Sequence, residues 1–253
     1  MSKIKILQLN VWTGRMKGAL PRFLRENDFD IVCMQEAVWS EQAPLHLAHF
    51  AETVDTLKAA GGFEYDLRQS NWGTRFLDGS AVMEQGNAIL SRLPIASSEN
   101  IWIHGDYSNE MKYGENWRAQ VEGQGYGAIK AKFENGLTLL THHGYWQPEP
   151  IGNEVTIECM QKVADALRDE KEKVVMCGDL NVVSESPAMR AFDGFLEDLT
   201  QTNGVTNTLQ YLKLDIDVPC DHILVSKDVK WSNFQVHEVM VSDHKALSVE
   251  IEI

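Results

Sequence analysis

The stretch VVMCGDLN, residues 174–181, sets an acidic and an amide side chain directly after a run of apolar residues. The apolar run predicts a buried strand, and Gly178 permits a tight strand-to-loop turn before Asp179. Asp179 and Asn181 are two residues apart, so on an extended segment their side chains share a face. The stretch therefore predicts a buried strand that ends in a pair of oxygen-bearing side chains.

The same plan, an apolar run beside an acidic or amide side chain, recurs along the whole chain. Hard cations such as Mg²⁺ and Mn²⁺ prefer carboxylate and amide oxygens, and phosphoryl chemistry needs such a cation with a base and an oxyanion stabiliser. The set therefore predicts a divalent-metal centre for phosphoryl chemistry. Its other members are Asn10 after 4–9, Glu36 after 31–35, Asp221 before 223–225, and Asp243 with His244 after 239–241.

Seven short motifs follow or open these strand-like runs: Leu9 to Trp12, Gln35 with Glu36, Gly86 to Ser91, Thr141 with His142, Gly178 to Asn181, Asp221 to Leu224 and Ser242 to His244. In this order they resemble the endonuclease/exonuclease/phosphatase superfamily, which includes deoxyribonuclease I, exonuclease III, apurinic endonucleases, sphingomyelinases and inositol-polyphosphate phosphatases. One motif of this length is a weak match, but seven in order make a strong one. The resemblance spans the chain from end to end.

Periodicity along the chain predicts an α/β or α+β fold. The expected strands lie near 4–10, 30–35, 86–91, 126–133, 137–142, 173–179, 220–225, 232–240 and 246–252, and the expected helices near 17–27, 46–60, 153–169 and 187–193. The resemblance sharpens this expectation to a four-layer αββα sandwich of two mixed β-sheets flanked by helices. The length of 253 residues, without a linker-like segment or a repeat, predicts a single catalytic domain over residues 1–253.

Composition narrows the classes of partner and compartment. The chain has 37 acidic against 23 basic side chains, a net charge of −14, which argues against broad electrostatic adhesion to nucleic acid. A local basic patch and a bound cation still permit a nucleic-acid substrate. The N-terminus lacks a signal-peptide pattern and no run has the length of a membrane span, so we expect a cytoplasmic protein without stable membrane association. The sequence gives no evidence of a protein partner.

Two further classes of protein are disfavoured, those built on structural zinc or disulfides and the NTPases. The four cysteines lie in apolar contexts without a C-x-x-C pair, which favours buried reduced thiols over a structural zinc site or a disulfide framework. A glycine-rich phosphate loop followed by Lys and Ser or Thr is absent, which argues against an NTPase.

The resemblance implies which residues hold the metal. Glu36 is expected to coordinate Mg²⁺ or Mn²⁺ directly, and Asn10 to hold the metal or its water. The other interpretation of Asn10 is a turn amide after the first strand. Asp243 is expected as a metal ligand or as the partner of His244.

The resemblance also implies the catalytic roles. Asp179 and Asn181 orient the attacking water and contact the phosphate, and Asp221 completes the polar floor of the site unless it merely opens its strand. His244 contacts the scissile phosphate or assists the water. Because neighbouring side chains on a strand point to opposite faces, a direct contact of His244 with Asp243 needs a turn; otherwise its partner is Asp179 or Asp221.

A second histidine poses the same question of parity. Only one of His142 and His143 can face the site from a regular strand. The Thr-His pattern of the resemblance selects His142, with a role in stabilising the phosphoryl charge or protonating the leaving oxygen, and His143 remains the alternative. His222 is expected on the outward face of its strand.

Two polar segments, 66–85 and 103–125, are expected to be long loops with substrate contacts. They contain Trp72, Arg75 and Arg118, which are candidates for bordering the substrate, by stacking on a base or packing on an apolar group. Packing of the aromatic rings against the body of the protein is the alternative. Asn87, in the Gly86 to Ser91 motif, is a further candidate for substrate binding.

These residues predict a metal-assisted in-line attack of water on a phosphorus ester, without a covalent enzyme intermediate. The first hypothesis for the substrate is nucleic acid, cleaved by an endonuclease or exonuclease. The alternative is a small-molecule or lipid phosphoester, in a sphingomyelinase-like or phosphatase-like reaction. A protein that only binds phosphorylated ligands is the lesser alternative.

Overall fold

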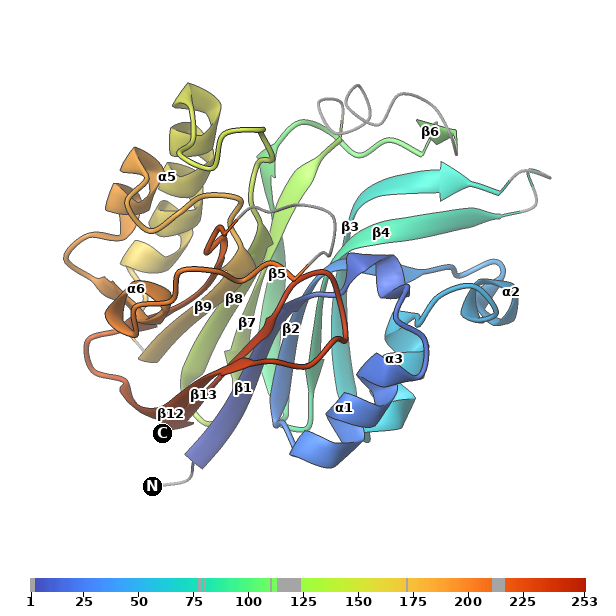
Figure 1. Ribbon diagram of the computed structural model, residues 1–253, viewed down its shortest axis with the longest axis horizontal. Helices are drawn as coiled ribbons and strands as arrows, with labels where there is room; N and C mark the ends of the chain where they lie inside the picture. The colour runs from blue at the N-terminus through green and yellow to red at the C-terminus, as the bar shows by residue number, and fades with distance from the viewer. Residues whose placement is uncertain are drawn as a thin grey trace.

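The structure, a computed structural model, describes residues 3–76, 79, 81–109, 111–112, 124–171, 173–210 and 217–253. Within these residues two mixed β-sheets pack face to face, and helices cover the outer face of each sheet (Figure 1). The four-layer sandwich expected from the sequence is confirmed. None of the helices in this part of the chain is long and apolar enough to cross a membrane.

One sheet carries both ends of the chain. Its strand order is β12 (Lys230–His237), β13 (Ala246–Glu252), β1 (Lys3–Asn10), β2 (Ile31–Trp39), β4 (Val82–Ser91), β3 (Tyr65–Arg75) and β6 (Met111–Lys112). β1 and β2 are parallel, so their C-terminal ends lie at the same edge of the sheet. β13 pairs antiparallel with β1, and its N-terminal end therefore lies at that edge too.

The second sheet has the order β10 (Leu196–Asp198), β11 (Asp221–Ser226), β9 (Lys173–Asp179), β8 (Leu137–His143), β7 (Tyr126–Phe133) and β5 (Ile95–His104). β8 and β9 are parallel, and β11 runs antiparallel to β9. Asn135 and Gly136 form the turn between β7 and β8, with a φ of 85° at Gly136. Here too, the end of one strand and the start of its neighbour meet at one edge.

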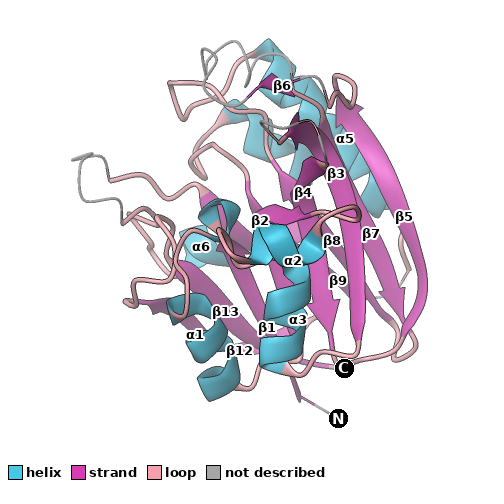
Figure 2. Ribbon diagram, turned by 90° about the vertical axis from the view of Figure 1, so that its right-hand side faces the viewer, coloured by secondary structure: helices cyan, strands magenta, loops and turns pink. Residues whose placement is uncertain are grey.

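The helices cover the two outer faces. α1 (Ala19–Asn27) and α3 (Val54–Gly61) lie over the first sheet (Figure 2), and α5 (Glu154–Arg168) packs on the second. The remaining short helices are α2 (Pro44–Ala48), α6 (Leu199–Thr202) and the 3₁₀ helices η1 (Trp12–Gly14) and η2 (Pro187–Phe192). The helix predicted over 46–60 is two helices, because Thr53 caps a new helix through its bond from the Thr56 amide.

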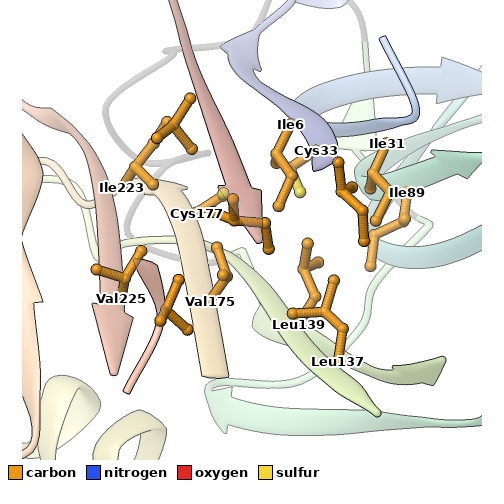
Figure 3. Close-up of a cluster of buried hydrophobic side chains, with 14 of the residues drawn as sticks. Ile6, Ile31, Cys33, Ile89, Leu137, Leu139, Val175, Cys177, Ile223 and Val225 are labelled. Carbon is orange, nitrogen blue, oxygen red and sulfur yellow. The ribbon is translucent and has the colours of Figure 1, made fainter. Parts of the chain in front are cut away.

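The core lies between the sheets and is built from alternate residues of the strands. Ile6 and Cys33 from the first sheet face Leu139, Val175 and Ile223 of the second (Figure 3). Burial of these side chains is the main favourable contribution to folding, roughly 25 cal/mol for each Å² of apolar surface. Where the strands end, the same alternation places polar side chains in the space between the two sheets.

The expected loop over 66–85 is wrong. This part of the chain contains β3 and the start of β4, which together form a long antiparallel hairpin. The strand is hard to detect because its inward residues, Gln69 and Asn71, are polar although they are buried. Sequence hydropathy therefore gives no alternation, and pairing with β4 decides the structure instead.

Helix α5 begins with a capping box. The Asn153 side chain accepts a bond from the Thr156 amide at 3.0 Å, and the Thr156 hydroxyl accepts from the Asn153 amide at 3.2 Å. We expect Asn153→Ala to lower the free energy of unfolding by about 1 kcal/mol, since it leaves an amide of the first turn without its partner. Urea denaturation measures the change. Glu158→Ala, at an exposed position of the same helix, is the control, and an equal loss there would contradict the capping argument.

Candidate active site

Side chains at the ends of strands from both sheets meet between the two layers. Asn10 ends β1, Asp179 ends β9 and Asp221 opens β11. The Asn10 Nδ2 donates to Asp179 Oδ2 at 3.0 Å, which joins the two sheets directly. The distribution of motifs over the whole chain thus becomes one cluster in space.

Asp179 is the centre of this cluster and is 1% exposed. Besides Asn10, its carboxylate accepts a bond from the Asn181 amide at 3.1 Å. The Nε2 atoms of His143 and His244 lie 3.5 and 3.7 Å from its Oδ2. Burial alone would raise the pKa of Asp179, but the positive charge of His244 and the hydrogen bond from His143 lower it below its ordinary value. The group is therefore an ionised acceptor at neutral pH.

His244 has a fixed partner in Asp221. The His244 Nδ1 lies 2.8 Å from Asp221 Oδ2, and the Asp221 amide donates to the Thr208 hydroxyl at 3.1 Å. Burial lowers the pKa of His244, but the negative charges of Asp221 and Asp179 outweigh it and raise the pKa well above its ordinary value. The ring is thus an oriented imidazolium. Of the partners left open by the sequence, Asp221 is the one observed.

Glu36 and Asp243 lie on the other side of Asn10. The Asn10 Nδ2 also donates to Glu36 Oε1 at 3.0 Å, and the Ser242 hydroxyl donates to Asn10 O at 2.6 Å and bonds Asp243 Oδ1 at 3.1 Å. Burial, with the nearby charge of Glu36, raises the pKa of Asp243 to about 6 against the opposing effect of His244. Two neighbouring carboxylates that repel each other fit a hard divalent cation. The Asn10 side chain bridges Glu36 and Asp179, whereas Asp243 is linked to the Asn10 carbonyl through Ser242. Asn10 Oδ1 accepts a bond from the Trp12 backbone amide at 3.0 Å.

Backbone strain is concentrated at this cluster. Six described residues other than glycine have a positive φ, and four of them adjoin the site: Trp12, Thr13, Glu36 and Asn181, at 47°, 53°, 51° and 56°. Glu36 lies where the pairing of β2 with β4 shifts register, so a bulge redirects its side chain. Such conformations cost about 1–3 kcal/mol each and persist where the surrounding structure imposes them.

The strained turn after β1 presents an aromatic and a basic side chain. The Arg15 guanidinium lies 5.1 Å from the centre of the Trp12 ring, and its Nε donates to the Thr13 hydroxyl at 3.0 Å. The turn is anchored at Gly14, where a Cβ atom would lie 2.2 Å from Glu52 O. Trp12 belongs to a motif seen in the sequence, but Arg15 gave no signal there.

The choice of His142 over His143 is wrong. Thr141 and His143 face the other sheet, since the Thr141 hydroxyl accepts from Gln35 at 2.9 Å and His143 contacts Asp179. Alternation turns His142 to the opposite face, where its Nδ1 bonds Gly127 O at 2.7 Å and the ring is fully buried. Burial lowers the pKa of His142 to about 4, whereas the contact with Asp179 raises the pKa of His143 against its own burial.

A buried network of hydrogen-bonded side chains lies beneath the cluster around Asp179. Gln35 bonds both Gln8 and Thr141, and Gln8 Nε2 donates to Asp221 Oδ1 at 3.3 Å. All four side chains are fully buried, and they come from both sheets. The network was missed at the sequence level, although Gln35 adjoins Glu36 and Gln8 lies two residues before Asn10.

The predicted substrate-binding residues are dispersed. Asn87 is fully buried and donates to Gly127 O at 2.7 Å, so it joins the two sheets rather than facing a substrate. Trp72 and Arg75 lie on the β3–β4 hairpin, and Arg75 contacts Asn109 at 3.4 Å. Arg118 lies outside the described residues.

Comparison with known proteins identifies the family. Residues 7–244 match the model of the endonuclease/exonuclease/phosphatase family. The chain belongs to this family. A search of curated proteins found no match.

Solved structures of the endonuclease/exonuclease/phosphatase fold agree with this. A family protein from Bacteroides thetaiotaomicron has a TM-score of 0.68 at 16% identity, over 99% of this chain and 97% of that one. A mannosyl-6-phosphatase from the same organism has a TM-score of 0.65 at 17% identity, covering 99% and 100% of the two chains. The human Nocturnin catalytic domain with bound sulfate has a TM-score of 0.66 at 15% identity, over 99% of this chain and 94% of that one. At these identities the likeness shows the shared fold alone.

The two adjacent histidines allow a matched test. We expect His143→Asn to lower kcat on bis-p-nitrophenyl phosphate by about 10²–10³, because it removes a charged group beside Asp179. His142→Asn retains a donor toward Gly127 O, and we expect less than about a tenfold change. Comparable losses in both variants, or a larger loss in His142→Asn, would contradict the assignment.

His222 lies on the outward face as expected, with its Nδ1 3.0 Å from Asp198 Oδ2. Against the effect of burial, Asp198 raises the pKa of His222 above 6.5, and His222 lowers the pKa of Asp198 below 3.8. Protonated His222 stabilises the folded state fully below about pH 6.5, and this contribution is lost as the pH rises through the pKa of His222 in the folded protein. Ionised Asp198 stabilises the folded state fully above about pH 4, and this contribution is lost as the pH falls through the pKa of Asp198 in the folded protein.

The pair should therefore stabilise the fold most between about pH 4 and 6.5. We expect the unfolding free energy of wild type minus that of Asp198→Asn to be larger at about pH 5.5 than at about pH 9. Urea denaturation at the two pH values measures it, and a difference independent of pH would contradict the argument.

Proposed function

We propose that this chain is a divalent-metal-dependent phosphoester hydrolase. The observation that carries the proposal is the buried Asp179 with Asn10, His143 and His244 around it, beside the carboxylates of Glu36 and Asp243. This set combines acceptors for water, cationic donors for a phosphoryl group and oxygen ligands for a hard cation. The family match supports the same reaction class.

Glu36 and Asp243 would hold the cation, with Asn10 fixing their positions. Mg²⁺ or Mn²⁺ bound there supplies a charge that polarises the phosphoryl oxygen and stabilises the leaving oxygen. The binding of a cation would also remove the repulsion that contributes to the raised pKa of Asp243.

The remaining groups act on the water and the phosphate. Asp179 is ionised and can accept a hydrogen bond from water. With Asn181 it would therefore orient the attacking water for in-line displacement. His244, held by Asp221 and positively charged, would stabilise the developing charge on the nonbridging oxygens. His143 would share this task or protonate the leaving oxygen.

Nucleic acid is the first substrate that we propose. The Trp12 and Arg15 pair follows Asn10 directly, and it offers a ring face and a guanidinium to the part of the substrate that does not react. A small-molecule phosphoester is the second candidate, because the net charge of −14 repels a long polyanion. Sugar phosphates belong in this test, since one structural neighbour is a mannosyl-6-phosphatase.

The first experiment is hydrolysis with Mg²⁺ of bis-p-nitrophenyl phosphate, single-stranded and abasic DNA, RNA, mannose 6-phosphate and sphingomyelin. We expect Glu36→Gln and His244→Ala each to reduce kcat by about 10²-fold or more on whichever substrate is cleaved. Glu158→Gln and His49→Ala, at exposed positions, are the controls and should retain activity.

The outcomes separate the candidates. Cleavage of DNA or RNA that falls steeply with salt supports a nuclease, and cleavage of a sugar phosphate with little salt dependence supports the second candidate. Absence of hydrolysis of every substrate, or hydrolysis that both site variants retain, would disprove the assignment.

A further inference from the structure

A thiol lies within the candidate active site. Cys220 immediately precedes Asp221, and its Sγ is 3.8 Å from Asp221 Oδ2. The Thr208 hydroxyl accepts bonds from the backbone amides of both residues at 3.1 Å, so the two side chains are held in place together. The thiol is buried but not sealed, with 5% of the residue exposed.

Four possible metal ligands converge at this thiol. Asp179, Cys220, Asp221 and His244 each offer one ligand atom, and these atoms all lie within 4.8 Å of one another. The donors of a tetrahedral zinc site lie about 3.3–3.8 Å apart, given bonds of about 2.0–2.3 Å to the metal. Two observed separations are in this range: 3.7 Å between His244 Nε2 and Asp179 Oδ2, and 3.8 Å between Cys220 Sγ and Asp221 Oδ2. Asp221 Oδ2 also lies 2.8 Å from His244 Nδ1, so binding of one ion by both residues requires this hydrogen bond to give way.

The donor set does not match the ion expected for catalysis. Mg²⁺ prefers oxygen ligands, whereas thiolate and imidazole favour Zn²⁺ and similar ions. Glu36 and Asp243 offer oxygen ligands only, whereas the group with Cys220 and His244 adds a sulfur and a nitrogen ligand. The site therefore presents two chemically distinct positions for cations.

We propose that Asp179, Cys220, Asp221 and His244 form an inhibitory site for a thiophilic divalent ion, with Zn²⁺ as the representative. Binding forms bonds from the metal to Cys220 Sγ and to His244 Nε2, and the thiol proton and one proton of the imidazolium pass to solvent. The 12% exposure of the His244 side chain gives the ion a path from solvent.

Inhibition follows because the ion engages groups needed for the reaction; this step rests on the proposed function. Asp179 would no longer be available to orient water, and His244 would lose the charge that stabilises the phosphoryl oxygens. Cys220 itself has no part in the proposed hydrolysis. Its replacement should therefore leave activity with Mg²⁺ in place and remove the sensitivity to zinc.

The direct test uses Co²⁺ as a spectroscopic substitute for Zn²⁺, with the full chain in excess Mg²⁺. We expect a thiolate-to-cobalt charge-transfer absorption in the wild type that Zn²⁺ displaces. Cys220→Ala and Cys220→Ser should abolish it. Cys159→Ala, at a cysteine on the buried face of α5, should retain it. Circular dichroism checks that each variant is folded. If Cys220→Ala does not fold, Cys220→Ser alone tests the role of the thiol.

A second measurement tests the consequence. We expect Zn²⁺ to inhibit the wild type against excess Mg²⁺, and Cys220→Ser to need at least about tenfold more Zn²⁺ for half inhibition. Absence of the absorption in the wild type, or its persistence in both Cys220 variants, would overturn the proposal. An unchanged zinc sensitivity in Cys220→Ser would overturn its inhibitory part. If no substrate is hydrolysed but the absorption depends on Cys220, the proposed function fails and the metal site stands.

Discussion

The ionised carboxylate of Asp179 is the constraint on which the site and the packing of the sheets both depend. A buried charge without partners would cost several kcal/mol, so the fold must supply donors to it. They come from Asn10 in one sheet and from His143 and His244 around it. Asn10 joins the two layers and also bonds Glu36, so the group that satisfies the Asp179 charge also positions the Glu36 carboxylate.

The contacts between the two sheets change from apolar to polar along the length of the strands. In the middle of the sandwich, alternating side chains such as Ile6 and Val175 exclude water and set the spacing of the sheets. Toward the strand ends, Gln8, Gln35 and Thr141 replace the apolar contacts with hydrogen bonds, which hold Asp221 from below. Asn10, Asp179 and Asp221 are therefore held by strands, whereas Asp243 and His244 lie in the connection between β12 and β13.

The sequence predicted much of this arrangement, because strand ends are visible as apolar runs that stop at a polar residue. Asn10, Glu36 and Asp179 were predicted in this way, Asp221 from the apolar run that follows it, and His244 from the apolar residues 239–241 before it. The histidine of β8 was not, since the choice between His142 and His143 depends on which face Thr141 takes, and the contact of Thr141 with Gln35 of the other sheet shows this only in the structure. Strand β3 was missed for a related reason, because Gln69 is buried through contacts that no local pattern records.

The pairing of β1 with β13 has a consequence for the biosynthesis of the protein. Lys3 is opposite Glu252, so β1 finds its outer neighbour only in β13, which lies far along the chain. Asn10 and Glu36 leave the ribosome early, whereas His244 is translated long after them. A nascent chain that ends before residue 244 thus lacks the imidazole beside Asp179 and the strand that covers β1. Such long-range closure slows folding, and it also means that the cluster around Asp179 can assemble only after His244 and β13 have been synthesised.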